Sequence, residues 1–425
     1  MKDVMDCKTT CNDDIVALNA YCRCLAIDPK GIAQTIAGQA QAKLGHLFES
    51  RPHLFAATAV FIDEVQLRDM EVQASAIEAA AASPSFRRLV AERTNPPTAP
   101  FDTRGLFLGF DFHLSPEGPK LIEVNTNAGG AFLVERLERA VSTTEESCRE
   151  VPFGTIYPVG GGIVRTLKKE FALVRPEHPL RRVAIVDEQP TEQFLYPDML
   201  LAAEELELQG VEAVICDPRV LALQGGSLWA EGKEIDLVYN RSCDFLLEDP
   251  ENRVLSDALQ QGAAVVSPAP LHHALYADKR NLVTWTDPGW QASSGLPSDV
   301  TGTLEKLPET VLVTGDSAEH LWAERKRYFF KPYAGFGSRA VYRGDKLTKR
   351  VWQDIIAGGY VAQKRVDPPM RALAGAENID ALKFDIRLFR YAGRTELVAA
   401  RIYQGQTTNL RTPGGGLGAV FVVPS

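Results

Sequence analysis

The sequence contains no run of about 18 apolar residues, so no membrane-spanning helix is expected. It has no excess of basic residues either. The formal net charge is −9, and non-specific nucleic-acid binding needs a basic surface. The first residues are polar and contain no apolar signal core. We therefore expect a cytoplasmic protein with neither nucleic acid nor membrane as a partner.

The seven cysteines form no paired Cys-x-x-Cys knuckles. An odd, scattered set in a long chain is typical of reduced thiols. Cys7, Cys11, Cys22 and Cys24 come nearest to a cluster, but the last two fall in a helical pattern. A metal cluster at these cysteines is therefore the less favoured alternative.

Three common nucleotide-binding motifs do not fit the stretches in which they would be expected. No Gly-x-Gly-x-x-Gly follows the first apolar strand of the middle region, which argues against a dinucleotide site. No Gly-Lys-Ser/Thr opens a helix in the lysine stretch described next, so that stretch is not a P-loop. A kinase-type glycine loop does not fit either, because such a loop precedes its lysine.

The stretch Tyr328–Val341, YFFKPYAGFGSRAV, offers a different arrangement. An apolar strand ends at Lys331, a loop with Gly335 and Gly337 follows, and Ser338 leads into a second strand. The lysine supplies a point charge, and the glycines allow backbone N–H groups to approach phosphate oxygens. The stretch therefore suits a triphosphate, with a plain β-hairpin turn as the alternative.

A second informative stretch is 106–127, LFLGFDFHLSPEGPKLIEVNTN, which predicts a β-hairpin around a Ser-Pro-Glu-Gly turn. Asp111 lies on the first strand. Glu123 and Asn125 lie two apart on the second, so their side chains share one face. Two carboxylates and an amide oxygen on one face suit Mg²⁺. A solvated hairpin face is the alternative.

The remaining pattern is that of a globular protein. At 425 residues, with 45% apolar and 24% charged residues, the chain can bury two or three cores. Residues 1–100 are mostly helical in pattern. Residues 181–268 alternate short apolar strands with helices, which predicts a parallel sheet. Residues 382–404 predict a second hairpin.

Together these segments resemble the ATP-grasp superfamily over 106–130 and most of 182–425. The most specific signal is the segment EVNTN, which contains Glu123 and Asn125. Gln363 opens the segment QKRV, which resembles the family's adenine-binding hinge. The family often has Glu there, and a Gln can bond the adenine amino group through its amide oxygen. By the same resemblance, the residues that hold ATP are Lys279, Lys331, Gly335, Gly337, Ser338, Gln363, Lys364 and Val366.

The resemblance also implies the residues that bind the metal and the substrate. Arg387 and Arg401 resemble strand residues near the transferred phosphate, where a planar guanidinium offsets negative charge. Asn409 and Arg411, in GQTTNLRTPGGG, are candidates for holding the acyl phosphate or the substrate carboxylate. The glycines 414–416 would let this segment approach a ligand, with a disordered tail as the alternative. The implied Mg²⁺ ligands are Asp111, Glu123 and Asn125.

The order of the segments departs from most of the family, in which the Glu-x-Asn hairpin comes last. Here the hairpin precedes the lysine strand by about 200 residues, so the chain resembles circularly permuted members. Those include eukaryotic glutathione synthetases and glutathionylspermidine synthetase-like proteins. If the order is permuted, 106–130 must share a sheet with 382–404, with the tail close to that sheet. The glycine loop lacks the acidic ligand of the glutathione synthetases, which argues against a glutathione-type substrate.

The expected fold class is α/β (α+β): a circularly permuted ATP-grasp fold, a preceding parallel βαβ domain and N-terminal helices. The expected parts are an N-terminal helical region over 1–100 packed on the core, a permuted ATP-grasp segment with the metal hairpin over 101–150, a parallel βαβ domain over 176–275, and an ATP-grasp domain over 276–425.

The resemblance implies ATP- and Mg²⁺-dependent ligation of a carboxylate to an amine or thiol, through an acyl phosphate. The expected partners are a small-molecule carboxylate and an amine, and a homodimer is left open. Two alternatives remain. One is an ATP-grasp phosphotransferase with a stable phosphate ester as product. The other is a nucleotide-binding protein without catalysis.

Overall fold

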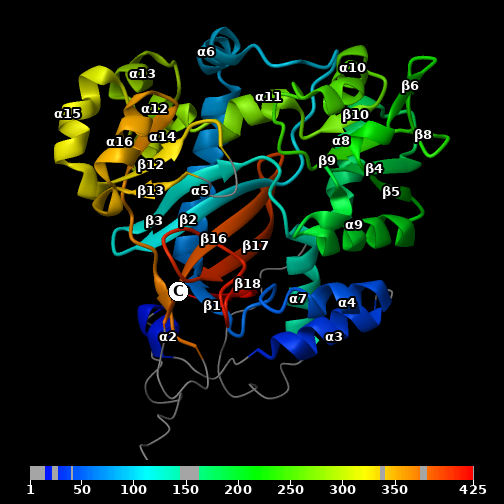
Figure 1. The fold of residues 1–425 in the computed structure, drawn as a ribbon, viewed down its shortest axis with the longest axis horizontal. Helices are drawn as coiled ribbons and strands as arrows, with labels where there is room; N and C mark the ends of the chain where they lie inside the picture. The colour runs from blue at the N-terminus through cyan, green and yellow to red at the C-terminus, as the bar shows by residue number, and fades with distance from the viewer. Residues whose placement is uncertain are drawn as a thin grey trace, which may run out of the picture.

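The computed structural model describes residues 15–21, 27–39, 42–143, 162–335, 340–373 and 381–424. Figure 1 shows a central sheet in cyan, orange and red, with a green sheet-and-helix module on one side and a yellow one on the other. None of the helices in the described ranges is long and apolar enough to cross a membrane. Gly337, Ser338 and the cysteines from Cys7 to Cys24 lie outside the described residues. Cys216 and Cys243, within them, are free thiols.

The central sheet joins the two predicted hairpins. Its order is β18-β17-β16-β2-β3, with β15 at the side of β16. β2 pairs antiparallel with β16, which places Asp111 opposite Arg387. The prediction that 106–130 and 382–404 share a sheet is therefore confirmed. The strands are β2 (Leu108–Ser115), β3 (Gly118–Asn125), β15 (Met370–Arg371), β16 (Leu382–Tyr391), β17 (Arg394–Tyr403) and β18 (Gly416–Gly418).

The two faces of the central sheet differ because residues alternate along each strand. Phe110 and Phe112 are fully buried in one cluster with Met70 and Ile77 of helix α5, Glu64–Ala82. Figure 1 shows this blue helix lying across the back of the sheet. Asp111, between the two phenylalanines, points to the other face. The apolar face thus anchors the hairpin, and the opposite face carries its polar side chains.

The green module contains the predicted parallel sheet, in the order β10-β9-β4-β5. A small antiparallel sheet, β6-β7-β8, comes between β5 and β9 in the sequence. The polar ends of β4 and β9 meet at the carboxyl edge, where the backbone N–H of Arg241 donates to the carbonyl of Val186 at 2.8 Å. The elements are α8 (Val164–Val174), β4 (Arg182–Val186), α9 (Tyr196–Leu208), β5 (Glu212–Cys216), β6 (Ala222–Gln224), β7 (Ser227–Ala230), β8 (Lys233–Ile235), β9 (Leu237–Asn240), α10 (Arg253–Gln261) and β10 (Val265–Ser267).

The yellow module is built on an antiparallel sheet in the order β11-β14-β12-β13. Phe330 of β12 is fully buried against Trp352, with the ring centroids 5.4 Å apart. The second strand of the lysine stretch begins at Tyr342, slightly later than expected. The elements are α11 (Pro270–His272), the π-helix η5 (His273–Ala277), α12 (Arg280–Trp285), α13 (Pro288–Ser293), α14 (Ser298–Leu304), β11 (Thr310–Leu312), α15 (Gly315–Ala323), β12 (Tyr328–Pro332), β13 (Tyr342–Arg343), α16 (Lys349–Ile356) and β14 (Tyr360–Lys364).

The mostly helical reading of the N-terminal region missed one strand. β1, Val60–Asp63, pairs in parallel with β19, Val420–Val423, at the other end of the chain. A four-residue apolar run gives no signal of a partner so distant in sequence. Ile36 and Leu44 are buried in the main core, so the N-terminal helices do pack on it. The other elements here are α2 (Ile15–Tyr21), α3 (Pro29–Gln39), α4 (Ala42–Glu49), α6 (Pro84–Thr94) and α7 (Ala131–Thr143).

The triple glycine 414–416 packs against the N-terminal region. Gly416 has a φ of +132°, and a Cβ there would lie 2.7 Å from the carbonyl oxygen of His53. The next residue, Leu417, donates its backbone N–H to the carbonyl of Leu54 at 2.8 Å. The glycines therefore allow close backbone packing beside β18, and the alternative of a disordered tail is wrong for these residues. The division of the chain into four domains stays a prediction.

Candidate functional site

A cavity lies between the polar face of the central sheet and the strands β12 and β14 of the yellow module. Residues from parts of the chain that are far apart in sequence line it. Most of the residues predicted to bind ATP or metal are brought together here. Those that line the cavity are Glu123, Asn125, Lys279, Lys331, Gly335, Gln363, Lys364 and Val366. Arg401, predicted near the transferred phosphate, also lines it.

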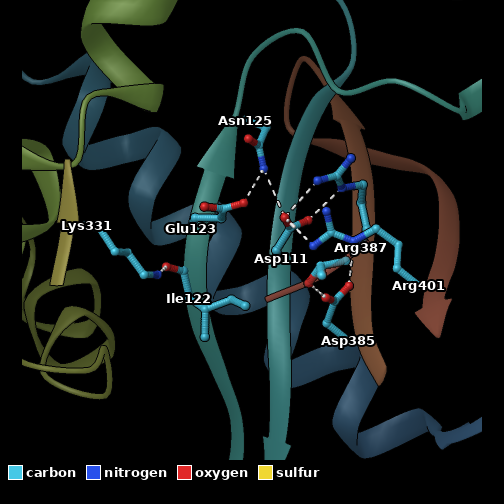
Figure 2. Close-up of polar contacts among 9 residues, drawn as sticks. Asp111, Ile122, Glu123, Asn125, Lys331, Asp385, Arg387 and Arg401 are labelled. Atoms are coloured by element: carbon cyan, nitrogen blue, oxygen red, sulfur yellow. Dashed lines mark hydrogen bonds and ion pairs between the residues drawn. The ribbon is translucent and has the colours of Figure 1, made fainter. Parts of the chain in front are cut away.

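Lys331 bridges the two walls of the cavity. Figure 2 shows its side chain reaching from β12 toward β3, where Nζ donates to the carbonyl oxygen of Ile122 at 3.0 Å. Nζ also donates to Oε1 of Gln363 at 2.7 Å. Burial lowers the pKa of Lys331 to about 8, although nearby Glu123 favours the charged form. Two hydrogen bonds thus fix the Lys331 ammonium group at the cavity, and Glu123 offsets only part of the cost of burying its charge.

Lys279 holds the start of the glycine loop. Its Nζ donates to the carbonyl oxygen of Gly335 at 3.0 Å, and its backbone N–H donates to that of Tyr333 at 3.1 Å. The neighbouring Arg280 stacks its guanidinium 4.3 Å from the centre of the Tyr333 ring. The two lysines therefore approach the cavity from different elements.

Glu123 and Asn125 offer oxygen atoms to the cavity from β3. The amide nitrogen of Asn125 donates to Oδ2 of Asp111 at 2.9 Å and to Oε1 of Glu123 at 3.2 Å. The amide oxygen of Asn125 consequently points away from both carboxylates (Figure 2). Burial alone would raise the pKa of Glu123, but Lys279, Lys331 and Arg401 outweigh it and lower the pKa to about 2. Glu123 therefore stays ionised.

Asp111 does not fit the expected role of metal ligand. It is fully buried, and its two oxygens accept hydrogen bonds from Nε and Nη2 of Arg387 at 2.6 and 2.7 Å. Nη2 of Arg401 adds a third at 2.7 Å, and Asn125 adds the fourth. These donors occupy both oxygens, so Asp111 orients the arginines instead. Figure 2 shows the two guanidinium groups converging on this one carboxylate.

Gly109 makes room for this arrangement on β2. A Cβ at this position would lie 2.7 Å from the Cβ of Ala128 and 3.2 Å from Nε of Arg387. Only a residue without a side chain lets the Arg387 guanidinium cross the strand to reach Asp111. The glycine in LFLGFDF is thus part of the structure of the site.

Arg401 connects Asp111 to the cavity. Its Nε donates to Oδ1 of Asp385 at 2.6 Å, and the hydroxyl of Thr408 donates to the other Asp385 oxygen at 2.7 Å. Burial opposes the charge of Arg401, but Asp111, Asp385 and Glu123 outweigh it and raise the pKa of the guanidinium. Arg401 lines the cavity, whereas Arg387 does not. Of the two predicted arginines, Arg401 is therefore the one that borders the cavity.

Asn409 and Arg411 do not line the cavity. The amide nitrogen of Asn409 donates to the carbonyl of Gln404 at 2.8 Å, and its oxygen accepts from the Thr412 hydroxyl at 3.0 Å. Asn409 thus shapes its own loop, and the Arg411 side chain is exposed. The loop reaches the cavity through Thr407 and Thr408 instead.

Sequence reasoning missed several residues of the cavity. His113 had an available signal, because it lies two residues from Asp111 on the same strand and so shares its face. The loop residues had none, since their position depends on the fold of the C-terminal segment. The missed residues are His113, Ile122, Phe329, Val341, Tyr403, Gln406, Thr407 and Thr408.

The described residues contain no group of three or more His, Cys, Asp or Glu side chains placed to hold a metal ion. With Asp111 engaged by arginines, Glu123 and Asn125 remain as a pair of oxygen donors. A pair fits Mg²⁺ when phosphate oxygens and waters complete its coordination. The site could hold such an ion together with a phosphate ligand, but not as an all-protein cage.

In this fold, a Glu-x-Asn strand of one sheet faces a lysine strand of another across the cavity. The fold is similar to that of a glutathione synthetase-like effector from Globodera pallida in its apo form. The TM-score is 0.53 at 11% identity, over 93% of this chain and 98% of that chain. At this identity the likeness shows the fold and not the activity.

Two further solved structures are less similar. A putative gamma-glutamylcysteine synthetase from Methylobacillus flagellatus gives a TM-score of 0.46 at 9% identity, over 82% of this chain and 84% of that chain. The ATP-grasp ligase PsnB, complexed with a minimal precursor, Mg and ADP, gives 0.28 at 15% identity, over 54% and 90%. Scores this low do not define a fold. No family model matches the sequence, and no curated protein does.

Proposed function

We propose that this chain is an ATP- and Mg²⁺-dependent ligase that joins a carboxylate to an amine or thiol through an acyl phosphate. The main support is that Lys331 and Glu123, far apart in sequence, line one cavity together with Lys279 and Arg401. Three cations beside one ionised carboxylate suit a polyphosphate with a bound divalent ion. The proposed substrates are small molecules.

In this proposal the nucleotide lies along the cavity between the two sheets. Lys331 and Lys279 hold the phosphates, and Gly335 lies beside them at the start of the glycine loop. Gln363, Lys364 and Val366 lie toward the base. Lys331 donates to two neutral oxygens in this structure, and a phosphate would be a stronger acceptor for the same ammonium group.

Glu123 and the amide oxygen of Asn125 would hold Mg²⁺. Bound there, the ion would neutralise charge on the phosphates during transfer. The low pKa of Glu123 supports this assignment, because the carboxylate is ionised at every physiological pH. Asp111 is left out of the ligand set for the reason given above.

Arg401 would contact the transferred phosphoryl group. Asp111 and Asp385 fix its guanidinium from two sides, so it is oriented before any ligand binds. Such preorganised donors stabilise charge that develops in a transition state. Arg387 is a positioning residue, since it acts on Asp111 and only through it on Arg401. Asn409 would maintain the loop that carries Thr407 and Thr408.

In the reaction, an oxygen of the substrate carboxylate would attack the terminal phosphorus of ATP, giving an acyl phosphate and ADP. The amine or thiol would then attack the acyl carbon and release phosphate. A phosphotransferase would instead keep the phosphate on its product, and a silent nucleotide-binding protein would release no ADP.

The test is incubation of the protein with ATP, Mg²⁺ and a metabolite extract, followed by mass spectrometry. The proposal expects ADP, free phosphate and a product whose mass equals two metabolites minus water. Arg401→Lys should reduce the yield of this product at least about tenfold, because lysine lacks the planar fork of donors. Arg253→Lys, at an exposed position on α10, is the matched control. A product that retains phosphate would favour the phosphotransferase.

A further inference from the structure

Two polar atoms at the hinge end of the cavity have no hydrogen-bond partner among the residues that the structure describes. They are Nε2 of His113 and Nε2 of Gln363. Both side chains line the cavity, and only 7% of His113 and 3% of Gln363 is exposed. A buried polar atom without a partner is unfavourable, and each such atom in a native structure requires an explanation. A ligand that bonds both atoms would supply it.

The other contacts of each side chain fix its polarity. An ammonium group can only donate, so Gln363 faces Lys331 with its amide oxygen, at 2.7 Å. The free end of Gln363 is therefore the amide nitrogen, which is a donor. The Gln363 oxygen, expected to bond an adenine amino group, already accepts from Lys331 in this structure, so the group left for a ligand is the amide nitrogen.

His113 has the opposite polarity at its free end. Its Nδ1 lies 2.9 Å from the carbonyl oxygen of Val366, which can only accept, so Nδ1 carries the hydrogen. Burial lowers the pKa of His113, which keeps the ring neutral. Nε2 then has a free lone pair and acts as an acceptor. Since Val366 lies three residues after Gln363, donor and acceptor both border the hinge.

We propose that Gln363 and His113 read the base of the nucleotide: His113 Nε2 accepts from the exocyclic amino group of adenine, and Gln363 Nε2 donates to a neighbouring ring nitrogen. The inference rests on the proposed nucleotide site and adds its selectivity. Adenine presents a donor at position 6, flanked by ring nitrogens with free lone pairs. Guanine has an oxygen at position 6, which would face the lone pair of His113 without a hydrogen between them. The site thus selects adenine over guanine.

The test measures dissociation constants by calorimetry for ATP and four analogues. GTP and purine riboside triphosphate lack the amino group at position 6. The 1-deaza and 7-deaza forms of ATP each lack one ring nitrogen beside it, and show which of the two accepts. Wild-type protein should bind ATP at least about tenfold more tightly than it binds GTP or purine riboside triphosphate. It should also bind ATP at least about tenfold more tightly than it binds one of the two deaza forms. Each of these weaker ligands leaves a buried polar group of the protein unpaired.

Variants then assign each preference to its residue. His113→Phe should reduce the gap between ATP and purine riboside triphosphate to below about threefold. Gln363→Leu should reduce the difference in affinity between ATP and the weaker-binding deaza form to below about threefold. The ratio of the dissociation constants of an analogue and of ATP, taken within one variant, is unaffected by a loss of affinity that is common to both ligands. The matched controls, His178→Phe and Gln353→Leu at exposed positions, should keep both gaps.

The outcomes separate this inference from the proposed function. If wild-type protein binds and hydrolyses ATP but binds the analogues equally well, the base-reading pair is wrong and the ligase proposal stands. Gaps that persist in His113→Phe and Gln363→Leu also overturn the pair. If no nucleoside triphosphate binds in the presence of Mg²⁺, both proposals fail.

Discussion

Nζ of Lys331 lies 3.0 Å from the carbonyl oxygen of Ile122, although 209 residues separate the two in the chain. Ile122 immediately precedes Glu123. The contact therefore places Lys331, proposed to bind the phosphates, beside the carboxylate proposed to bind Mg²⁺. A triphosphate with its bound ion needs both groups at one location. The contact is the geometric basis of the predictions for Lys331 and Glu123.

Replacing the lysine should affect phosphates and not the nucleoside. Lys331→Ala should weaken ATP binding by about 10- to 100-fold, the effect of losing one charge-assisted hydrogen bond, and adenosine binding by much less. Calorimetry with both ligands measures the difference. Lys349→Ala, at an exposed position on α16, is the control. Equal losses for ATP and adenosine would remove Lys331 from the phosphates.

The pH dependence of ATP binding should follow the same lysine. Burial lowers the pKa of Lys331 to about 8 in the free protein, so the ammonium loses its proton as the pH rises past that value. Phosphates favour the charged form and raise the pKa on binding. Affinity should therefore be full below pH 8 and decline above it, with proton uptake on binding. Calorimetry in two buffers of different ionisation enthalpy measures that uptake. A constant affinity from pH 7 to 9 would contradict the assignment.

The two carboxylates on the hairpin should respond differently to amide substitution. Glu123→Gln should raise the Mg²⁺ concentration needed for ATP binding at least about tenfold, because it removes the negative charge of a ligand, and Asn125→Ala should act in the same direction, because it removes an oxygen ligand. Asp111→Asn should leave the Mg²⁺ requirement nearly unchanged. Magnesium titrations at fixed ATP distinguish the two cases. If Asp111→Asn shifted the titration as much as Glu123→Gln, Asp111 would be a ligand after all.

Asp111→Asn should act on stability instead. It leaves Arg387 and Arg401 buried beside a neutral side chain, which costs about 3–5 kcal/mol in comparable buried pairs. Urea unfolding measures this loss, and a variant as stable as wild type would show that the arginines do not depend on Asp111.

Glycine 109 should tolerate no side chain. Gly109→Ala would place a Cβ 2.7 Å from that of Ala128 and should cost about 1–3 kcal/mol of stability through overpacking. Gly302→Ala is a matched control, because a Cβ at this position in α14 meets nothing within 4 Å. Alanine is the better helix former, so the control should be neutral or slightly stabilising. Equal stability of the two variants in thermal unfolding would show that the β2 strand adapts to the methyl group.

Local patterns in the sequence predicted much of this fold. Both hairpins are marked by a turn between apolar strands, and the parallel sheet by its alternation of strands and helices. The strand at Val60 could not be found this way, because its partner at Val420 lies at the other end of the chain. The permuted order of segments stays a prediction, although the shared sheet agrees with it.

The site was predictable in its residue types more than in its contacts. Glu123, Asn125 and Lys331 were found because their chemistry and spacing are distinctive. The role of Asp111 was not, since a carboxylate beside Glu-x-Asn suggests a metal until the positions of Arg387 and Arg401 are known. The orientation of Gln363 likewise depends on Lys331, a neighbour only in three dimensions.

The most direct test of the central claim, that Lys331 and Glu123 act on one bound nucleotide, is a double-mutant cycle on MgATP binding. Dissociation constants are measured by calorimetry for wild type, Lys331→Ala, Glu123→Gln and the double variant. If both residues act on one MgATP, the loss of binding free energy in the double variant should differ from the sum of the losses in the two single variants by at least about 1 kcal/mol. Additive losses, or tight MgATP binding by the double variant, would contradict the account.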